Sequence, residues 1–69
     1  METWNYANDT RNDIHHRLGD MLASLANADR AIARNDKVAA DTHNRNALTH
    51  FYKAKTIMIR LEDELNSKV

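Results

Sequence analysis

Arg34-Asn35-Asp36-Lys37 decides the fold, because this polar stretch separates two apolar patterns of helical spacing. Before it, apolar residues recur in alternating steps of four and three, which is the spacing of one face of a helix. After it, a second pattern takes up the same steps. We name the positions of both patterns the predicted seam: Ile14, Leu18, Met21, Leu25, Ala28 and Ile32, followed by Ala40, Asn44, Ala47, Phe51, Ala54, Met58, Leu61 and Leu65.

One unbroken helix over residues 9–66, about 85 Å long at a rise of 1.5 Å per residue, is the rival interpretation. Continuing the first pattern beyond Ile32 would fill the core positions mainly with polar side chains, such as Asn35, Thr42 and Asn46. Neither a four-residue stutter nor a three-residue stammer explains the offset between the two patterns. A reversal of the chain between them does explain it.

The two patterns match in the register of an antiparallel hairpin, in which facing residues have a constant sum of residue numbers. That sum is 72, as for Met21 with Phe51. Asn35 can adopt the left-handed conformation that ends a helix, and Asp36 can cap the next one. We therefore predict a single all-α domain over residues 1–69, an antiparallel two-helix hairpin with helices at about 9–34 and 37–66 and a turn at 35–36.

The start of the first helix has several candidates. Thr10 with Asp13 resembles a capping box, while Asn8 or Asp9 could cap the helix one turn earlier, and a start at Thr3 also continues the seam. Two aromatic residues in this segment are expected to cover the open end of the helices or to anchor a partner: Trp4 and Tyr6.

Composition narrows the class of protein. The 69 residues include no Cys, which excludes disulfides and thiolate zinc sites, and only one Gly and no Pro, which favours an all-α chain. Ten Lys or Arg balance ten Asp or Glu, so the positive excess typical of nucleic-acid-binding domains is missing. With neither a membrane-spanning apolar run nor the pattern of a signal peptide, a cytoplasmic protein is expected.

A lone hairpin of this length should be marginally stable, since a single small core contributes only a few kcal/mol. The apolar residues left over from the seam gather on one flank of the hairpin. We therefore expect a homodimer that buries this flank in a four-helix bundle. The predicted interface, with a copy of the chain or another protein, comprises Gly19, Leu22, Ala26, Leu48, Tyr52, Lys55 and Ile59.

No catalytic motif is present, and neither an enzyme nor a cofactor is expected. His43 and His50 are seven residues apart, about 10 Å along a helix, which is too far for one metal ion. A metal site is therefore not expected.

The other flank carries more basic than acidic side chains, beside the aromatic rings of Phe51 and Tyr52. It is a candidate for RNA contact through four residues, Arg17, His50, Lys53 and Arg60.

Three functions are consistent with these features. The first is a non-enzymatic protein–protein interaction module, a small adaptor, inhibitor or regulator that works as a self-associating helical hairpin. The second is an RNA-binding hairpin regulator, and the third is an oligomer that sequesters a small ligand between its subunits. The identity of the partner is not encoded in any motif.

Overall fold

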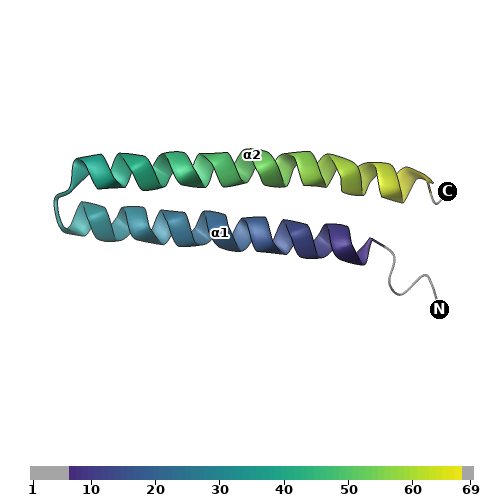
Figure 1. Ribbon diagram of the computed structural model, residues 1–69, viewed down its shortest axis with the longest axis horizontal. Coiled ribbons are helices and arrows are strands. Elements are labelled where there is room, and N and C mark those ends of the chain that lie inside the picture. Colours follow the sequence, from purple (N-terminus) through teal and green to yellow (C-terminus); the bar gives the residue numbers. More distant parts are fainter. Residues whose placement is uncertain (1–6, 68–69) are drawn as a thin grey trace.

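Two antiparallel α-helices lying side by side make up the computed structural model, which describes residues 7–67 (Figure 1). Helix α1 spans Asn8–Ala33 and helix α2 spans Lys37–Ser67. The predicted all-α hairpin is confirmed, and the unbroken helix is wrong. Trp4 and Tyr6 lie outside the described residues.

The turn between the helices is closed by backbone hydrogen bonds. The N–H of Asp36 donates to the carbonyl of Ala31 at 2.8 Å, and the N–H of Asn35 donates to Ile32 at 2.9 Å. This pair of bonds is a Schellman motif, and Asn35 supplies its left-handed residue with φ 61°. Asp36 then caps α2, because its carboxylate accepts a hydrogen bond from the N–H of Ala39 at 3.1 Å. Both roles predicted for the turn are confirmed.

Replacing Asn35 tests how strongly this turn stabilises the fold. We expect Asn35→Val to lower the free energy of unfolding by about 1–2 kcal/mol, because a β-branched residue is strained at positive φ. The matched variant Asn35→Gly should unfold at the same denaturant concentration as the original protein or a higher one. Urea unfolding followed by circular dichroism gives both values, and equal midpoints for the Val and Gly variants would contradict the prediction.

Helix α1 begins without a side-chain cap. Its N-cap residue is Ala7 at φ 57°, and no side-chain hydrogen bond caps this end. Thr10 is buried, with 3% of its surface exposed, and its hydroxyl donates a hydrogen bond to Glu64 of α2. The candidate capping box at Thr10 is therefore wrong, because this hydroxyl bonds across the hairpin rather than to its own helix. The alternative caps at Asn8 and Asp9 are wrong as well, since both residues lie inside α1.

The core between the helices consists mainly of alanine. Ile14 is the only large apolar side chain buried among residues 7–67, at 8% exposed. Small side chains let two helix backbones approach closely. The buried residues are Thr10, Ile14, Ala28 and Ala31 of α1 and Ala40, Ala47 and Ala54 of α2.

The register agrees with the prediction, but the rotation of the helices about their axes differs from it. Polar contacts between the helices join residues whose numbers sum to between 70 and 74, around the predicted 72. The line along which the two helices meet nevertheless includes His43, His50 and Ile57. These residues are half-buried, and each directly precedes a residue of the predicted seam. Six large seam residues are consequently exposed, whereas Ile14 is buried and Met21 and Leu61 are half-buried; the six are Leu18, Leu25, Ile32, Phe51, Met58 and Leu65. The predicted seam is thus correct in register and incomplete as a core.

Candidate interaction surface

Large apolar side chains lie exposed along one broad face of the hairpin. They come from both helices and expose between 38% and 62% of their surface, so none is part of the core. Successive members in each helix are three, four or seven residues apart, which places them on one side of that helix. We name this surface the apolar face: Leu18, Leu22, Leu25 and Ile32 of α1, with Leu48, Phe51, Met58 and Leu65 of α2.

A shallow groove shows that the two helices share this face. Its walls come from α1 on one side and α2 on the other, and its volume is about 300 Å³. The lining is apolar apart from the head group of one lysine. The groove is lined by Ile14, Leu18, Phe51, Ala54, Lys55 and Met58.

The interface residues predicted from the sequence are divided between this face and the outer sides of the helices. Leu22 and Leu48 belong to the apolar face, and Lys55 lines its groove. Tyr52 and Ile59 directly follow face residues, so they point about 100° further round α2. They are 57% and 53% exposed.

Two residues of the predicted interface, Gly19 and Ala26, are small residues of α1. Gly19 is exposed, and a Cβ atom added there would meet no atom within 4 Å. Nothing in the hairpin therefore requires glycine at this position. Ala26, seven residues later, is half-buried. The ring of Phe51 packs edge-on against that of Tyr52, with centroids 5.5 Å apart, which joins the apolar face to the outer side of α2.

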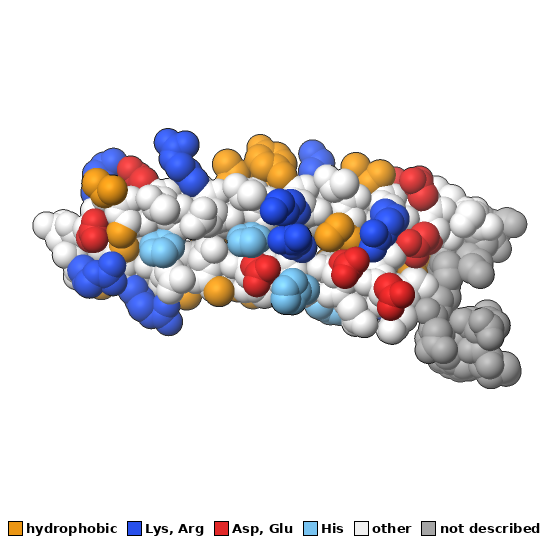
Figure 2. All heavy atoms as spheres, viewed as in Figure 1, with side chains coloured by type: hydrophobic (Ala, Val, Ile, Leu, Met, Phe, Trp, Pro, Cys, Tyr) orange, Lys and Arg blue, Asp and Glu red, His pale blue; other side chains and the backbone are white. Residues whose placement is uncertain are grey.

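The opposite broad face is polar. Figure 2 shows this side, where acidic, basic and histidine side chains follow the line along which the helices meet. Asp20 Oδ2 lies 3.9 Å from His50 Nδ1 and 3.7 Å from His16 Nε2, so one carboxylate faces two imidazoles. His50 Nδ1 is buried and forms no hydrogen bond within residues 7–67.

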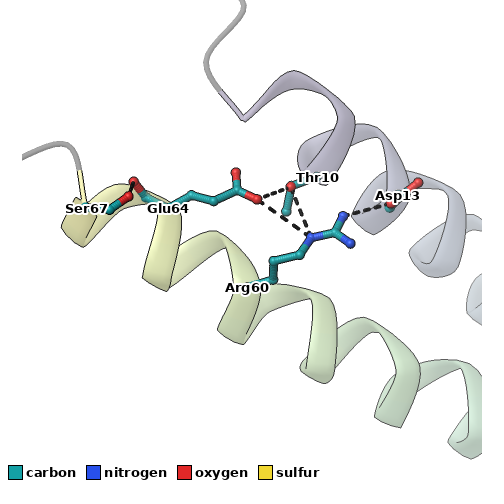
Figure 3. A network of polar contacts seen from close by, with 5 residues as sticks. All are labelled: Thr10, Asp13, Arg60, Glu64 and Ser67. Carbon is teal, nitrogen blue, oxygen red and sulfur yellow. Dashed lines mark hydrogen bonds and ion pairs between the residues drawn. The ribbon is translucent and has the colours of Figure 1, made fainter.

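A polar network joins the open ends of the two helices (Figure 3). The Thr10 hydroxyl donates to Glu64 Oε1 at 2.6 Å and accepts a hydrogen bond from Arg60 Nε at 3.2 Å. Arg60 Nη2 also donates to Asp13 Oδ2 at 2.8 Å. The guanidinium thus links carboxylates from both helices and partly neutralises the acidic end of α2, where carboxylates oppose the helix dipole.

Thr10→Val should measure the contribution of this network. We expect the free energy of unfolding to fall by about 1 kcal/mol, because a buried donor to a carboxylate is lost while side-chain volume is kept. Thr56→Val is the matched control, since Thr56 is exposed and its hydroxyl bonds only within α2, to the carbonyl of Tyr52. Chemical unfolding of both variants checks the prediction, and an equal loss in the two would contradict it.

The predicted RNA contacts lie on the polar face, but two of them are paired with acids. Arg60 is held by Asp13 and Glu64, and His50 faces Asp20. Arg17 is half-buried and Lys53 is exposed. A phosphate would therefore have to compete with carboxylates of the protein for Arg60.

Within residues 7–67, no cluster of three or more His, Cys, Asp or Glu side chains is arranged to hold a metal ion. Neither α1 nor α2 contains a stretch long and apolar enough to cross a membrane.

Comparison with known proteins gives one limited similarity. A segment of leucine-rich repeat-containing protein 36 from Homo sapiens is 30% identical to this chain over 63 residues. The match takes in 91% of the chain but only 8% of the human protein, so it assigns no family. No family model matches the chain. No solved structure matches it either.

Proposed function

We propose that this chain is a non-enzymatic interaction module, a helical hairpin that associates through its apolar face and acts as an adaptor, inhibitor or small regulator of another macromolecule. One observation carries the proposal: the hairpin buries mainly alanines and exposes most of its large apolar side chains. Such an arrangement leaves about half of the hydrophobic free energy of the apolar-face side chains unused in the monomer, because they are between 38% and 62% exposed. Contiguous exposed apolar surface of this kind marks interaction sites.

The energetics support association. Each of the eight side chains of the apolar face is already partly shielded, so complete burial contributes roughly 1 kcal/mol per residue. The total, on the order of 8 kcal/mol per chain and twice that for a pair of chains, is comparable with the cost of bringing two molecules together. The free energy of folding of an isolated hairpin is small by comparison.

Sedimentation equilibrium over a range of protein concentrations tests the proposal. We expect the mass of a dimer, with dissociation to monomer only on dilution. A monomer at all concentrations, with its helices intact by circular dichroism, would contradict self-association. Titration with single- and double-stranded RNA at several salt concentrations tests the rival function, because binding through phosphates weakens steeply as salt rises.

A further inference from the structure

We propose that the outer side of α2, which is turned away from α1, binds an acidic amphipathic helix of another protein. We name this surface the outer stripe: Val38, Thr42, Arg45, Thr49, Tyr52, Thr56 and Ile59. Its residues are not part of the apolar face, so they stay open when that face is covered in a dimer. The inference rests on the proposed function as an interaction module and names the class of partner and the surface that binds it.

The outer stripe has the spacing of a second helix-packing seam. Its members recur in steps of four and three, which places them on one side of α2. Ala47 and Ala54 are buried against α1, and Tyr52 points about 140–160° away from both at 100° per residue. Val38, Tyr52 and Ile59 are 78%, 57% and 53% exposed. Helix α2 therefore carries a seam that α1 does not cover.

The threonines make the outer stripe less polar than its composition indicates. The hydroxyl of Thr49 donates to the carbonyl of Arg45, and that of Thr56 donates to the carbonyl of Tyr52, both at 3.1 Å. Thr42 makes the same kind of bond one heptad earlier. Because these hydroxyl donors are used within α2, a neighbouring helix would meet mainly threonine methyl groups and larger apolar side chains.

The middle of α2 is basic. Residues 42–61 include four Lys or Arg and no Asp or Glu, although the whole chain has no net charge. Arg60 is paired with acids of both helices, and Asp41, just before this segment, is paired with Lys37 at 3.2 Å. The other three cations form no ion pair within residues 7–67: Arg45, Lys53 and Lys55. In Figure 2 this side is seen in profile along the upper edge, where basic and apolar side chains follow one another over the middle of α2.

Arg45 determines the chemistry of the partner. It occupies a position of the outer stripe one heptad before Tyr52, so a helix packed there would take its guanidinium out of water. A buried unpaired charge costs several kcal/mol, and a carboxylate opposite Arg45 removes that cost through charge-assisted hydrogen bonds. Lys53 and Lys55 lie on the two sides of Tyr52 and would pair with acids at the edges of the same helix. Lys55 also lines the groove of the apolar face, so Arg45 and Lys53 are the cations that a dimer leaves free.

Two other partners fit the outer stripe less well. Two copies packed on each other about Tyr52 would bring their unpaired cations together, and like charges oppose such an interface. RNA would be bound mainly through its phosphates and 2′-hydroxyl groups, which leaves the side chains of Val38 and Ile59 without apolar contacts. An apolar seam with acidic flanks satisfies both the apolar and the basic members of the stripe.

Two synthetic helical peptides test the proposal by fluorescence anisotropy with the full chain. The acidic peptide has leucines at its seam positions, one glutamate at a central seam position and glutamates on its flanks. The basic peptide has lysine in place of every glutamate. We expect the acidic peptide to bind at least about 10-fold more tightly than the basic one. Its affinity should fall as salt rises, because exposed charge pairs are screened.

Arg45→Glu should weaken binding of the acidic peptide at least about 10-fold and strengthen binding of the basic peptide. Arg30→Glu is the matched control, because Arg30 is exposed on α1 and the same change of charge lies outside the outer stripe. It should leave both affinities nearly unchanged. Circular dichroism checks that both variants keep their helices.

Thr49→Asp separates the outer stripe from the apolar face. Its carboxylate lies in the middle of the stripe, so it should weaken binding of the acidic peptide and leave the mass in solution unchanged. The proposal is overturned if the acidic peptide binds no more tightly than the basic one, or if Arg45→Glu and Arg30→Glu weaken it equally. Single-stranded RNA that binds more tightly than the acidic peptide, and is lost in Arg45→Glu, would assign the stripe to nucleic acid instead. A monomeric native protein that binds the acidic peptide through Arg45 would contradict self-association and support the proposed partner.

Discussion

Phe51→Asp is expected to leave the protein monomeric at concentrations where the proposed self-association makes the original chain a dimer. Phe51 lies in the middle of the apolar face, 45% exposed, beside the groove that α1 and α2 share. Association would bury the new carboxylate, and an unpaired buried charge costs several kcal/mol. We expect the dimer dissociation constant to rise by more than about 100-fold, which corresponds to roughly 3 kcal/mol at 1.4 kcal/mol per factor of ten.

Sedimentation equilibrium measures this change, and circular dichroism checks that the helices remain. Thr49→Asp is the matched control, because Thr49 is exposed on the same helix and lies outside the apolar face. It adds the same charge and should leave the mass in solution unchanged. If Phe51→Asp stays dimeric while Thr49→Asp dissociates, the interface lies on another face of the hairpin.

Ile59→Asp shows how far the interface extends round α2. Ile59 directly follows Met58 of the apolar face, so its side chain points about 100° away toward the outer side of the helix. We expect a smaller rise in the dissociation constant than for Phe51→Asp, measured in the same way. An equal rise would extend the interface to the outer side of α2, where the sequence predicts it at Tyr52 and Ile59.

Ala47→Leu is expected to lower the free energy of unfolding by about 1–3 kcal/mol. Ala47 is 4% exposed between the helices, and a larger side chain would force them apart. In a hairpin of marginal stability this loss is a large part of the total free energy of unfolding. Partial unfolding at room temperature should therefore be visible by circular dichroism.

Asn46→Leu is the matched control for this overpacking. Asn46 is the preceding residue of the same helix and is exposed, so the same leucine should change stability by less than about 0.5 kcal/mol there. Urea unfolding of the two variants gives the comparison. Equal stability of the Ala47 and Asn46 variants would show that the helices are not in close contact at Ala47.

Chain reversal could be predicted from local chemistry alone. Asn35 tolerates positive φ and Asp36 caps a helix in any context, so the turn needs little information from the rest of the chain. The register followed from the spacing of two patterns about that turn. The start of α1 could not be predicted this way, because the Thr10 hydroxyl binds Glu64, more than fifty residues away in the chain.

The rotation of each helix about its own axis also could not be predicted from the apolar pattern. That pattern placed Leu18, Leu25 and Phe51 in the core, whereas the structure buries alanines and leaves these side chains on a face. A signal was present in the heptad spacing of Ala40, Ala47 and Ala54, which predicts a line of close approach along α2. Together with the polar residues beside that line, this spacing distinguishes the buried core from the exposed apolar face.

The order of residues thus determined two helices, the turn that joins them and the register in which they meet, since each depends on local conformation and spacing. Only the packing of one helix on the other decided which side chains were buried. Small residues allow two backbones to approach, and the large residues beside them are then left facing outward. The apolar face results from this packing of the two helices.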